Sequence, residues 1–205
     1  MLGNHGRSIT RTLFTPLARL LARLHVTPDM VTVAGTVASV AIAWGVLARG
    51  YLWQGAVALG VVLFCDSVDG TLARLTGTSS KFGAFLDSTL DRIGDGSVFG
   101  ALTAWAALGM GAGPARTTVV VAGLVAMVGV GTVPYARARA ESIGIEAKVG
   151  IAERTDRLVI GLLGAFLTGL GLSPWFLAAG LLWVAFASLF TVGQRIAFTR
   201  KALTE

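Results

Sequence analysis

Long runs of apolar residues, separated by short polar stretches, dominate the chain. Segments 31–48 and 117–136 contain no charged residue, and segment 158–194 contains none over 37 positions. A helix needs about 20 mostly apolar residues to cross a membrane, so the last run fits two short helices with a turn at 169–174. The pattern predicts a helical membrane protein.

The apolar segments predict six transmembrane helices, in an all-α integral membrane protein with a single domain over residues 1–205. One of them carries four charged residues in its first half and is counted because the rest of the segment is apolar. The predicted spans lie at about 31–48, 51–75, 82–108, 117–140, 157–170 and 174–196.

A shorter amphipathic segment precedes the first span. Leucines at helical spacing share one face of residues 8–24, and arginines occupy the rest. This pattern predicts a helix that lies in the membrane interface; the alternative is a basic leader that only sets topology. Thr27-Pro28-Asp29 then predicts a helix start, with a capping threonine, proline in the first turn and an acid near the positive end of the dipole.

Basic residues lie almost entirely on one side of the predicted membrane. Only Arg49 and Arg116, of 17 lysines and arginines, fall in the connections on the other side. Cytoplasmic loops carry the excess of Lys and Arg. We therefore expect a multi-pass protein of the cell membrane with both termini in the cytoplasm.

Composition excludes most other classes of protein. Hydrophobic residues make up 54% and charged residues 14%, against about 25% charged in soluble domains, and the mean hydropathy is +0.74. A single cysteine, Cys65, excludes a disulfide scaffold. The net charge of +6 predicts contact with anionic lipid headgroups or a phosphorylated substrate, and not with nucleic acid.

Five of the 11 acidic residues fall between positions 66 and 95. Asp66 and Asp69 are three residues apart and Asp87 and Asp91 four, so each pair shares a helix face. Oxygen ligands without cysteine or histidine suit Mg²⁺ or Mn²⁺, and four carboxylates suffice for two ions that clamp a phosphoryl group. The alternative is a proton or cation pathway in a transporter. Asp95 continues the series but is left out of the predicted metal set.

The residues between these acids form a longer pattern. From Asp66 to Asp91 the chain is D-x2-D-G-x2-A-R-x8-G-x3-D-x3-D, which resembles the signature of the CDP-alcohol phosphotransferase family at all eight fixed positions. The six-span layout agrees with that family over the whole chain. The resemblance implies a CDP-linked alcohol as donor, attack by an acceptor hydroxyl on the β-phosphorus, and release of CMP.

The resemblance also assigns roles to residues. It implies two Mg²⁺ ions, with Mn²⁺ as a possible substitute, held by Asp66, Asp69, Asp87 and Asp91. Asp91 is the implied general base, and Gly70 and Gly83 let the donor approach the backbone. The implied binding residues for CDP-diacylglycerol are Asp29, Met30, Val31, Thr32, Gly70, Arg74 and Ser80.

Three further stretches, TPDMVT, RARAE and ERTDRL, are similar to a branch of this family, the actinobacterial phosphatidylinositol phosphate synthases. That likeness implies inositol 3-phosphate as the acceptor and a homodimer. It implies an acceptor-phosphate site made by Arg137, Arg154, Arg157 and Arg195. Two alternatives remain open: the arginines only mark topology, or the acceptor is glycerol 3-phosphate, as in a phosphatidylglycerophosphate synthase.

Overall fold

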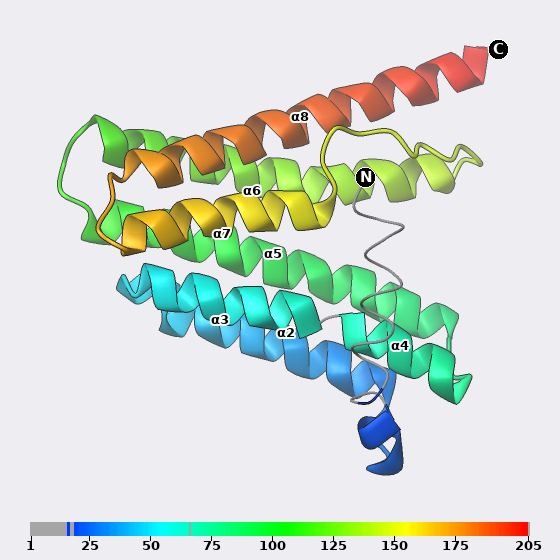
Figure 1. The fold of residues 1–205 in the computed structure, drawn as a ribbon. Helices are drawn as coiled ribbons and strands as arrows, with labels where there is room; N and C mark the ends of the chain where they lie inside the picture. Colours follow the sequence, from blue (N-terminus) through cyan, green and yellow to red (C-terminus); the bar gives the residue numbers. More distant parts are fainter. Residues whose placement is uncertain (1–15, 17–18, 66, 205) are drawn as a thin grey trace.

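The described part of the chain is helical, with short connections. A computed structural model describes residue 16, residues 19–65 and residues 67–204, without the side chains of Ser67 and Asp69. Its elements are α2 (Pro28–Gly45), η1 (Leu47–Arg49), α3 (Leu52–Cys65), α4 (Ser67–Thr76), α5 (Lys81–Gly109), α6 (Pro114–Glu141), α7 (Arg154–Gly169) and α8 (Trp175–Thr204), as Figure 1 shows.

Most predicted segments agree with these helices to within a few residues. Thr27 caps α2 as predicted, since its hydroxyl accepts a hydrogen bond from the Met30 amide at 3.3 Å. The helix α8 extends beyond the predicted span 174–196, because it continues through the basic residues to Thr204. Of the predicted interfacial helix 8–24, residues 19–23 are helical; residues 8–15 and 17–18 lie outside the described part of the chain.

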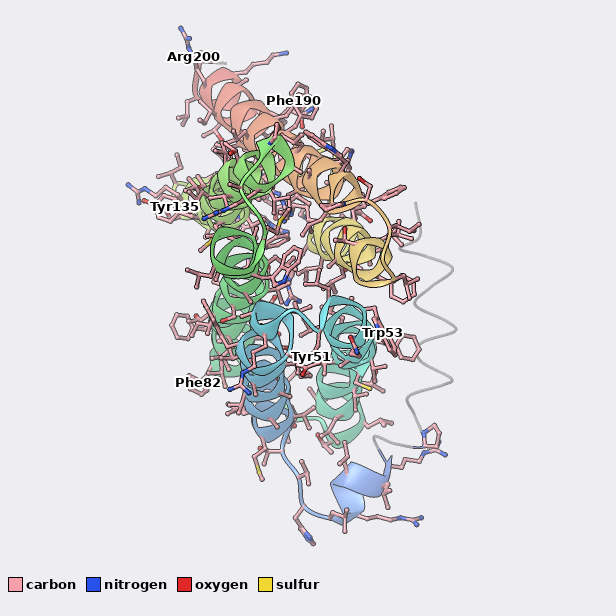
Figure 2. The ribbon with its side chains drawn as sticks, turned by 90° about the vertical axis from the view of Figure 1, so that its left-hand side faces the viewer. Tyr51, Trp53, Phe82, Tyr135, Phe190 and Arg200 are labelled. Atoms are coloured by element: carbon pink, nitrogen blue, oxygen red, sulfur yellow. The ribbon has the colours of Figure 1, made fainter. Side chains whose placement is uncertain are left out.

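The helices pack side by side in a closed ring. α2 packs on α5, α5 on α6, α6 on α8, α8 on α7, α7 on α3, and α3 again on α2. Figure 2 shows this ring nearly end-on. α5 therefore stands between α2 on one side and α6 on the other, and α4 follows α3 at the end of the bundle where α2 begins (Figure 1).

The inside of the ring is apolar, and many large apolar side chains also lie outside it. The core is mostly Ala, Val and Leu, together with Phe99. A Cβ at Gly129 would lie 2.7 Å from the Ser188 Cβ, so α6 and α8 require glycine there to approach this closely. Phe82, Tyr135 and Phe190 are 62%, 67% and 46% exposed and point outward in Figure 2. An apolar exterior, with glycine where helices approach closely, is typical of a protein surrounded by lipid.

Four stretches of the described chain are long and apolar enough to cross a membrane: Pro28–Arg49, Leu52–Thr76, Pro114–Glu141 and Trp175–Thr204. The molecule is therefore a membrane protein. The six predicted spans also include α5 and α7. α7 has only 16 residues, and α5 carries Asp87, Asp91, Arg92 and Asp95 in its first half. Length and composition alone therefore do not identify α5 or α7 as membrane-spanning.

Candidate functional site

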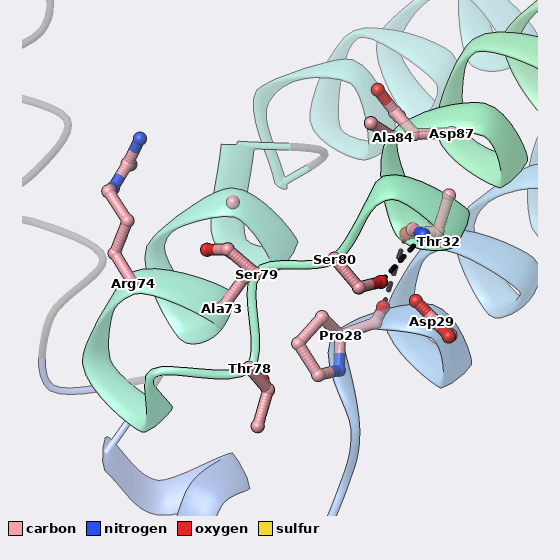
Figure 3. A pocket seen from close by; sticks show the side chains of 12 residues that line it. Pro28, Asp29, Thr32, Ala73, Arg74, Thr78, Ser79, Ser80, Ala84 and Asp87 are labelled. Carbon is pink, nitrogen blue, oxygen red and sulfur yellow. Dashed lines mark hydrogen bonds between the residues drawn. The ribbon is translucent and has the colours of Figure 1, made fainter.

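Polar side chains gather at the end of the bundle where α2 and α5 begin and α6 ends. A pocket of about 250 Å³, here called the α4 pocket, lies between α2, α4 and the start of α5 (Figure 3). Most of the residues predicted to bind the donor line it: Asp29, Thr32, Gly70, Arg74 and Ser80, together with Gly83 and Asp87. Met30 and Val31 belong to the same turn of α2 but do not line this pocket.

Two helix starts form one wall of the α4 pocket. The Ser80 hydroxyl caps α5 by accepting a hydrogen bond from the Gly83 amide at 2.9 Å. A Cβ at Gly83 would lie 3.2 Å from both the Asp29 Oδ1 and the Ser80 Oγ, so glycine lets α5 start directly against α2. The amides at a helix start favour anions, which makes this wall suitable for phosphate.

The opposite wall is α4. Among the described residues, nothing lies within 4 Å of where a Cβ on Gly70 would be. The Arg74 guanidinium donates a hydrogen bond to the Thr71 hydroxyl at 3.3 Å, and its side chain is exposed at the pocket. A cation and a side-chain-free helix surface on one wall suit a phosphorylated ligand.

A second and larger hollow lies one turn farther along α5. This arginine cavity, of about 690 Å³, is lined by the ends of α5, α6, α7 and α8 and by the loop after α6. All four arginines predicted for an acceptor phosphate line it: Arg137, Arg154, Arg157 and Arg195. The sequence could not show that these residues meet, because they come from three helices, and the structure brings them together.

The four arginines differ in how they are held. Arg137 pairs with Glu141 at 2.8 Å and is half-exposed. The Arg195 guanidinium donates to the carbonyls of Val149 (3.1 Å) and Val133, which fastens the loop after α6 to α8. Arg157 is only 3% exposed.

Arg157 is the arginine whose donors are least satisfied. Among the described residues its Nε and Nη1 find no hydrogen-bond partner although both atoms are buried. A buried charged group without a partner costs several kcal/mol, and such groups in native proteins call for a ligand or water. The arrangement is therefore suited to an anion in the arginine cavity.

Two aspartates one turn apart connect the two hollows. Asp87 lines the α4 pocket and Asp91 lines the arginine cavity. Side chains four residues apart on a helix have Cβ atoms about 5–6 Å apart. One face of α5 thus presents carboxylates to both hollows.

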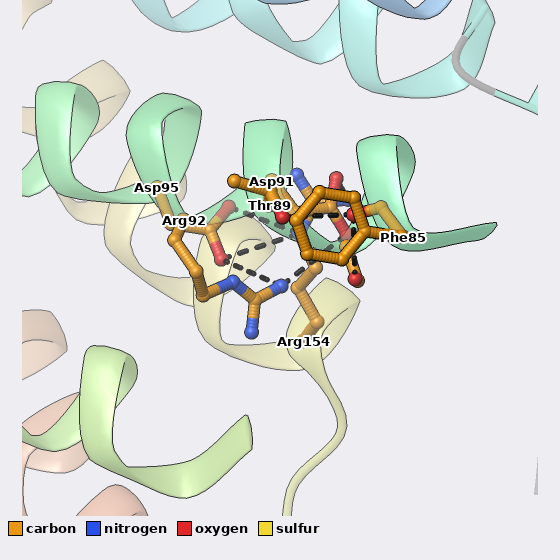
Figure 4. Close-up of polar contacts among 7 residues, drawn as sticks. Phe85, Thr89, Asp91, Arg92, Asp95 and Arg154 are labelled. Atoms are coloured by element: carbon orange, nitrogen blue, oxygen red, sulfur yellow. Dashed lines mark hydrogen bonds and ion pairs between the residues drawn. The ribbon is translucent and has the colours of Figure 1, made fainter. Parts of the chain in front are cut away.

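Asp91 belongs to an ion-pair network that reaches α7 (Figure 4). Its two oxygens lie 3.0 Å from the Arg154 Nη1 and 3.2 Å from the Arg92 Nη2. The Arg154 Nε also donates to both oxygens of Asp95, at 2.9 and 3.2 Å. Asp95 is 1% exposed, and its distance to Arg92 is longer, at 3.9 Å. Its main partner is therefore Arg154.

Sequence reasoning missed Lys148, which also lines the arginine cavity. Lys148 contacts Glu146 at 2.6 Å in the loop after α6, and this contact lowers the pKa of the Glu146 carboxyl below its usual value. Its position in the loop between RARAE and ERTDRL is the sequence feature that could have predicted Lys148 as a neighbour of the four arginines.

The predicted metal site can be examined for two of its four aspartates. Asp66 and the Asp69 side chain lie outside the described part of the chain, and no group of three acidic, histidine or cysteine residues gathers among the residues that are described. Asp87 and Asp91 supply carboxylate oxygens from successive turns, and the lining of both hollows contains neither cysteine nor histidine among the described residues. This donor chemistry fits Mg²⁺ or Mn²⁺. The quartet itself stays a prediction.

The arrangement has a counterpart in a known family. Residues 25–193 match the family model described as CDP-alcohol phosphatidyltransferase, so the chain belongs to the CDP-alcohol phosphatidyltransferase family. Within it, the chain is 42% identical to phosphatidylinositol phosphate synthase of Cutibacterium acnes, over 97% of each chain. It is 38% identical to the enzyme of that name from Corynebacterium glutamicum, over 98% of this chain and 90% of the other.

Solved structures agree with this assignment. Phosphatidylinositol phosphate synthase of Mycobacterium tuberculosis with CDP-DAG bound superposes with a TM-score of 0.85 at 39% identity, covering 92% of this chain and 94% of that one. The same enzyme in complex with manganese and citrate also gives 0.85 at 39% identity, covering 91% and 88%.

Proposed function

We propose that this protein is a phosphatidylinositol phosphate synthase, which transfers a phosphatidyl group from CDP-diacylglycerol to inositol 3-phosphate and releases CMP. The observation that carries the proposal is the pair of hollows along successive turns of α5. One has helix starts, glycine and Arg74 for a nucleotide diphosphate, and the other has four arginines for a phosphorylated acceptor. Asp87 and Asp91 stand between them. The relatives that carry this name support the assignment.

In this proposal the two substrates meet at α5. CDP-diacylglycerol occupies the α4 pocket, where Asp29, Thr32 and Ser80 contact the nucleotide and Arg74 its phosphates; Met30 and Val31 complete the same turn. Inositol 3-phosphate places its phosphate among Arg137, Arg154, Arg157 and Arg195, as bidentate guanidinium contacts favour. Its attacking hydroxyl then faces Asp91.

The reaction is an in-line displacement at phosphorus. The inositol hydroxyl oxygen forms a bond to the β-phosphorus while the bond from that phosphorus to the bridging oxygen breaks, and CMP leaves with those electrons. Asp91 accepts the hydroxyl proton. Most of the catalysis is positioning and charge neutralisation. Two divalent ions, held by Asp66, Asp69, Asp87 and Asp91, supply charge neutralisation for the diphosphate when bound.

The proposal places this end of the bundle at the cytoplasmic face. All six long segments would cross the membrane, with α5 at 29 residues and thus about 44 Å long, and α7 at 16 residues and about 24 Å. The exposed Leu20 and Leu24 support an interfacial helix before α2. The lysines and arginines near the two hollows support a cytoplasmic site. The protein would act as a homodimer, as its likeness to the actinobacterial branch of the family implies.

The test is release of radiolabelled CMP from CDP-diacylglycerol by the purified full-length protein in lipid nanodiscs with Mg²⁺. We expect release with inositol 3-phosphate and at least tenfold less with glycerol 3-phosphate or free inositol. Preference for glycerol 3-phosphate would make the protein a phosphatidylglycerophosphate synthase. No release with any acceptor would favour a transporter that uses the aspartates as an ion pathway.

Arg157 provides a test of the acceptor site. Arg157→Met keeps the length of the side chain and removes the buried charge, so we expect the KM for inositol 3-phosphate to rise by about ten- to a hundredfold, the equivalent of about 1.5–3 kcal/mol for hydrogen bonds to a charged group. The melting temperature should change little, because the cost of burying the guanidinium and its attraction to Asp95 oppose each other. Arg200→Met, in the exposed end of α8, is the control. An unchanged KM would exclude Arg157 from the acceptor site.

A further inference from the structure

Asp95, one turn beyond Asp91 on α5, is a carboxylate beside the arginine cavity to which the family resemblance assigns no role. It is 1% exposed, so it lies behind the cavity wall and not in it. It is not among the residues that line the α4 pocket or the arginine cavity. Whatever it does for the reaction must therefore pass through another side chain.

That side chain is Arg154. Its Nε donates to both Asp95 oxygens, at 2.9 and 3.2 Å, across 59 positions of sequence and from α7 to α5. Its Nη1 lies 3.0 Å from the Asp91 Oδ1, and Arg154 also lines the arginine cavity. One guanidinium thus touches a buried carboxylate, a carboxylate beside the reacting groups and the cavity itself, as Figure 4 shows in part.

The charges around Asp95 are unequal. Arg92, Arg154 and Arg157 all act on it electrostatically, so one buried anion faces three guanidinium groups. Without it, Arg154 would have Asp91 as its nearest carboxylate and would turn fully toward it. Asp91 would then be neutralised more strongly, and the cavity would lose an arginine fixed in one orientation.

We infer that Asp95 is a positioning residue that holds the Arg154 guanidinium in the orientation that binds the phosphate of the acceptor. This inference rests on the proposed function, since it needs a phosphorylated acceptor in the arginine cavity. It adds to the proposed function that a buried residue of α5 controls the affinity for the acceptor. Asp95 itself touches neither substrate.

The experiment compares KM values in CMP release. Asp95→Asn keeps the size of the side chain and removes its charge, and we expect the KM for inositol 3-phosphate to rise about tenfold or more, because hydrogen bonds to charged groups account for that much. The KM for CDP-diacylglycerol should change less than twofold. Asp95→Glu restores the charge and should recover part of the acceptor affinity.

A matched control addresses a purely structural role. Thr103→Val removes a buried hydrogen bond of the same helix, α5, where the Thr103 hydroxyl donates to the Phe99 carbonyl at 2.7 Å. It should lower the melting temperature while the KM for inositol 3-phosphate stays the same. If Asp95→Asn behaves like this control, the inference is wrong.

A double variant gives an independent test that also serves if Asp95→Asn does not fold. Arg154→Lys keeps the charge but removes the planar guanidinium that contacts two carboxylates at once. The KM of Asp95→Glu/Arg154→Lys for inositol 3-phosphate should be no higher than that of the poorer single variant, because the effects of two residues that act through one contact do not add. Additive losses would overturn the inference.

The wild-type protein separates the two proposals. If it releases no CMP with inositol 3-phosphate, the proposed function fails. If it does release CMP but the Asp95 variants bind the acceptor normally, only this inference fails.

Discussion

Asp91→Asn should abolish phosphatidyl transfer while leaving a folded protein. The asparagine has nearly the same volume, but it cannot accept the proton of the attacking hydroxyl and is a poorer ligand for a divalent ion. Loss of a general base alone typically costs 10²–10⁴-fold, so we expect turnover to fall by about a thousandfold or more. The measurement is CMP release at saturating concentrations of both substrates.

The structure adds a reason to expect little damage to the fold. Asp91 is partly exposed at the cavity, and its partners Arg154 and Arg92 also contact Asp95, so neither loses its only carboxylate. A melting temperature close to that of the wild type is therefore expected. Glu146→Gln, in the exposed loop that borders the cavity, is the matched control and should remain active. Retention of more than a tenth of the activity by Asp91→Asn would contradict its assignment as the base.

Removal of divalent ions should stop phosphatidyl transfer as completely as Asp91→Asn does. Chelation with EDTA removes the charge neutralisation of the diphosphate, which is equivalent to several kcal/mol and therefore to about a thousandfold or more in rate. Addition of Mg²⁺ or Mn²⁺ should restore CMP release, whereas Ca²⁺, which favours longer bonds and more ligands, should not. Complete activity in EDTA would exclude the predicted metal site.

A variant connects this effect to α5. Asp87→Asn should raise the concentration of Mn²⁺ needed for half-maximal activity, because one carboxylate on the wall of the α4 pocket is lost. Thr89→Val, also in α5, is the useful comparison, since the Thr89 hydroxyl donates to the Phe85 carbonyl of its own helix and lines neither hollow, so the Mn²⁺ requirement should stay unchanged. An equal shift in both variants would mean that the effect is a general one on α5 and not on metal binding.

Much of the fold could be read from local sequence. The uncharged run at 117–136 predicts α6, and Thr27-Pro28-Asp29 predicts the start of α2, because hydrophobic period and helix caps depend on neighbours along the chain. The helix α8 continues past the apolar run that predicts its span, because charged residues such as Arg200 end an apolar run without ending a helix. The structure identifies four membrane-spanning stretches by length and composition, and the six predicted spans add α7, which is short, and α5, which is charged.

The candidate site divides in the same way. The sequence by itself determined the family and the candidate aspartates, because the signature lies within 26 consecutive positions and helical spacing already puts Asp87 and Asp91 on one face. Only the tertiary structure decided that Arg137, Arg154, Arg157 and Arg195 share one cavity, and that Asp95 pairs with Arg154 more closely than with Arg92. The physical reason is that these contacts join different helices, and the packing order of the ring, which no local pattern encodes, determines which of them meet.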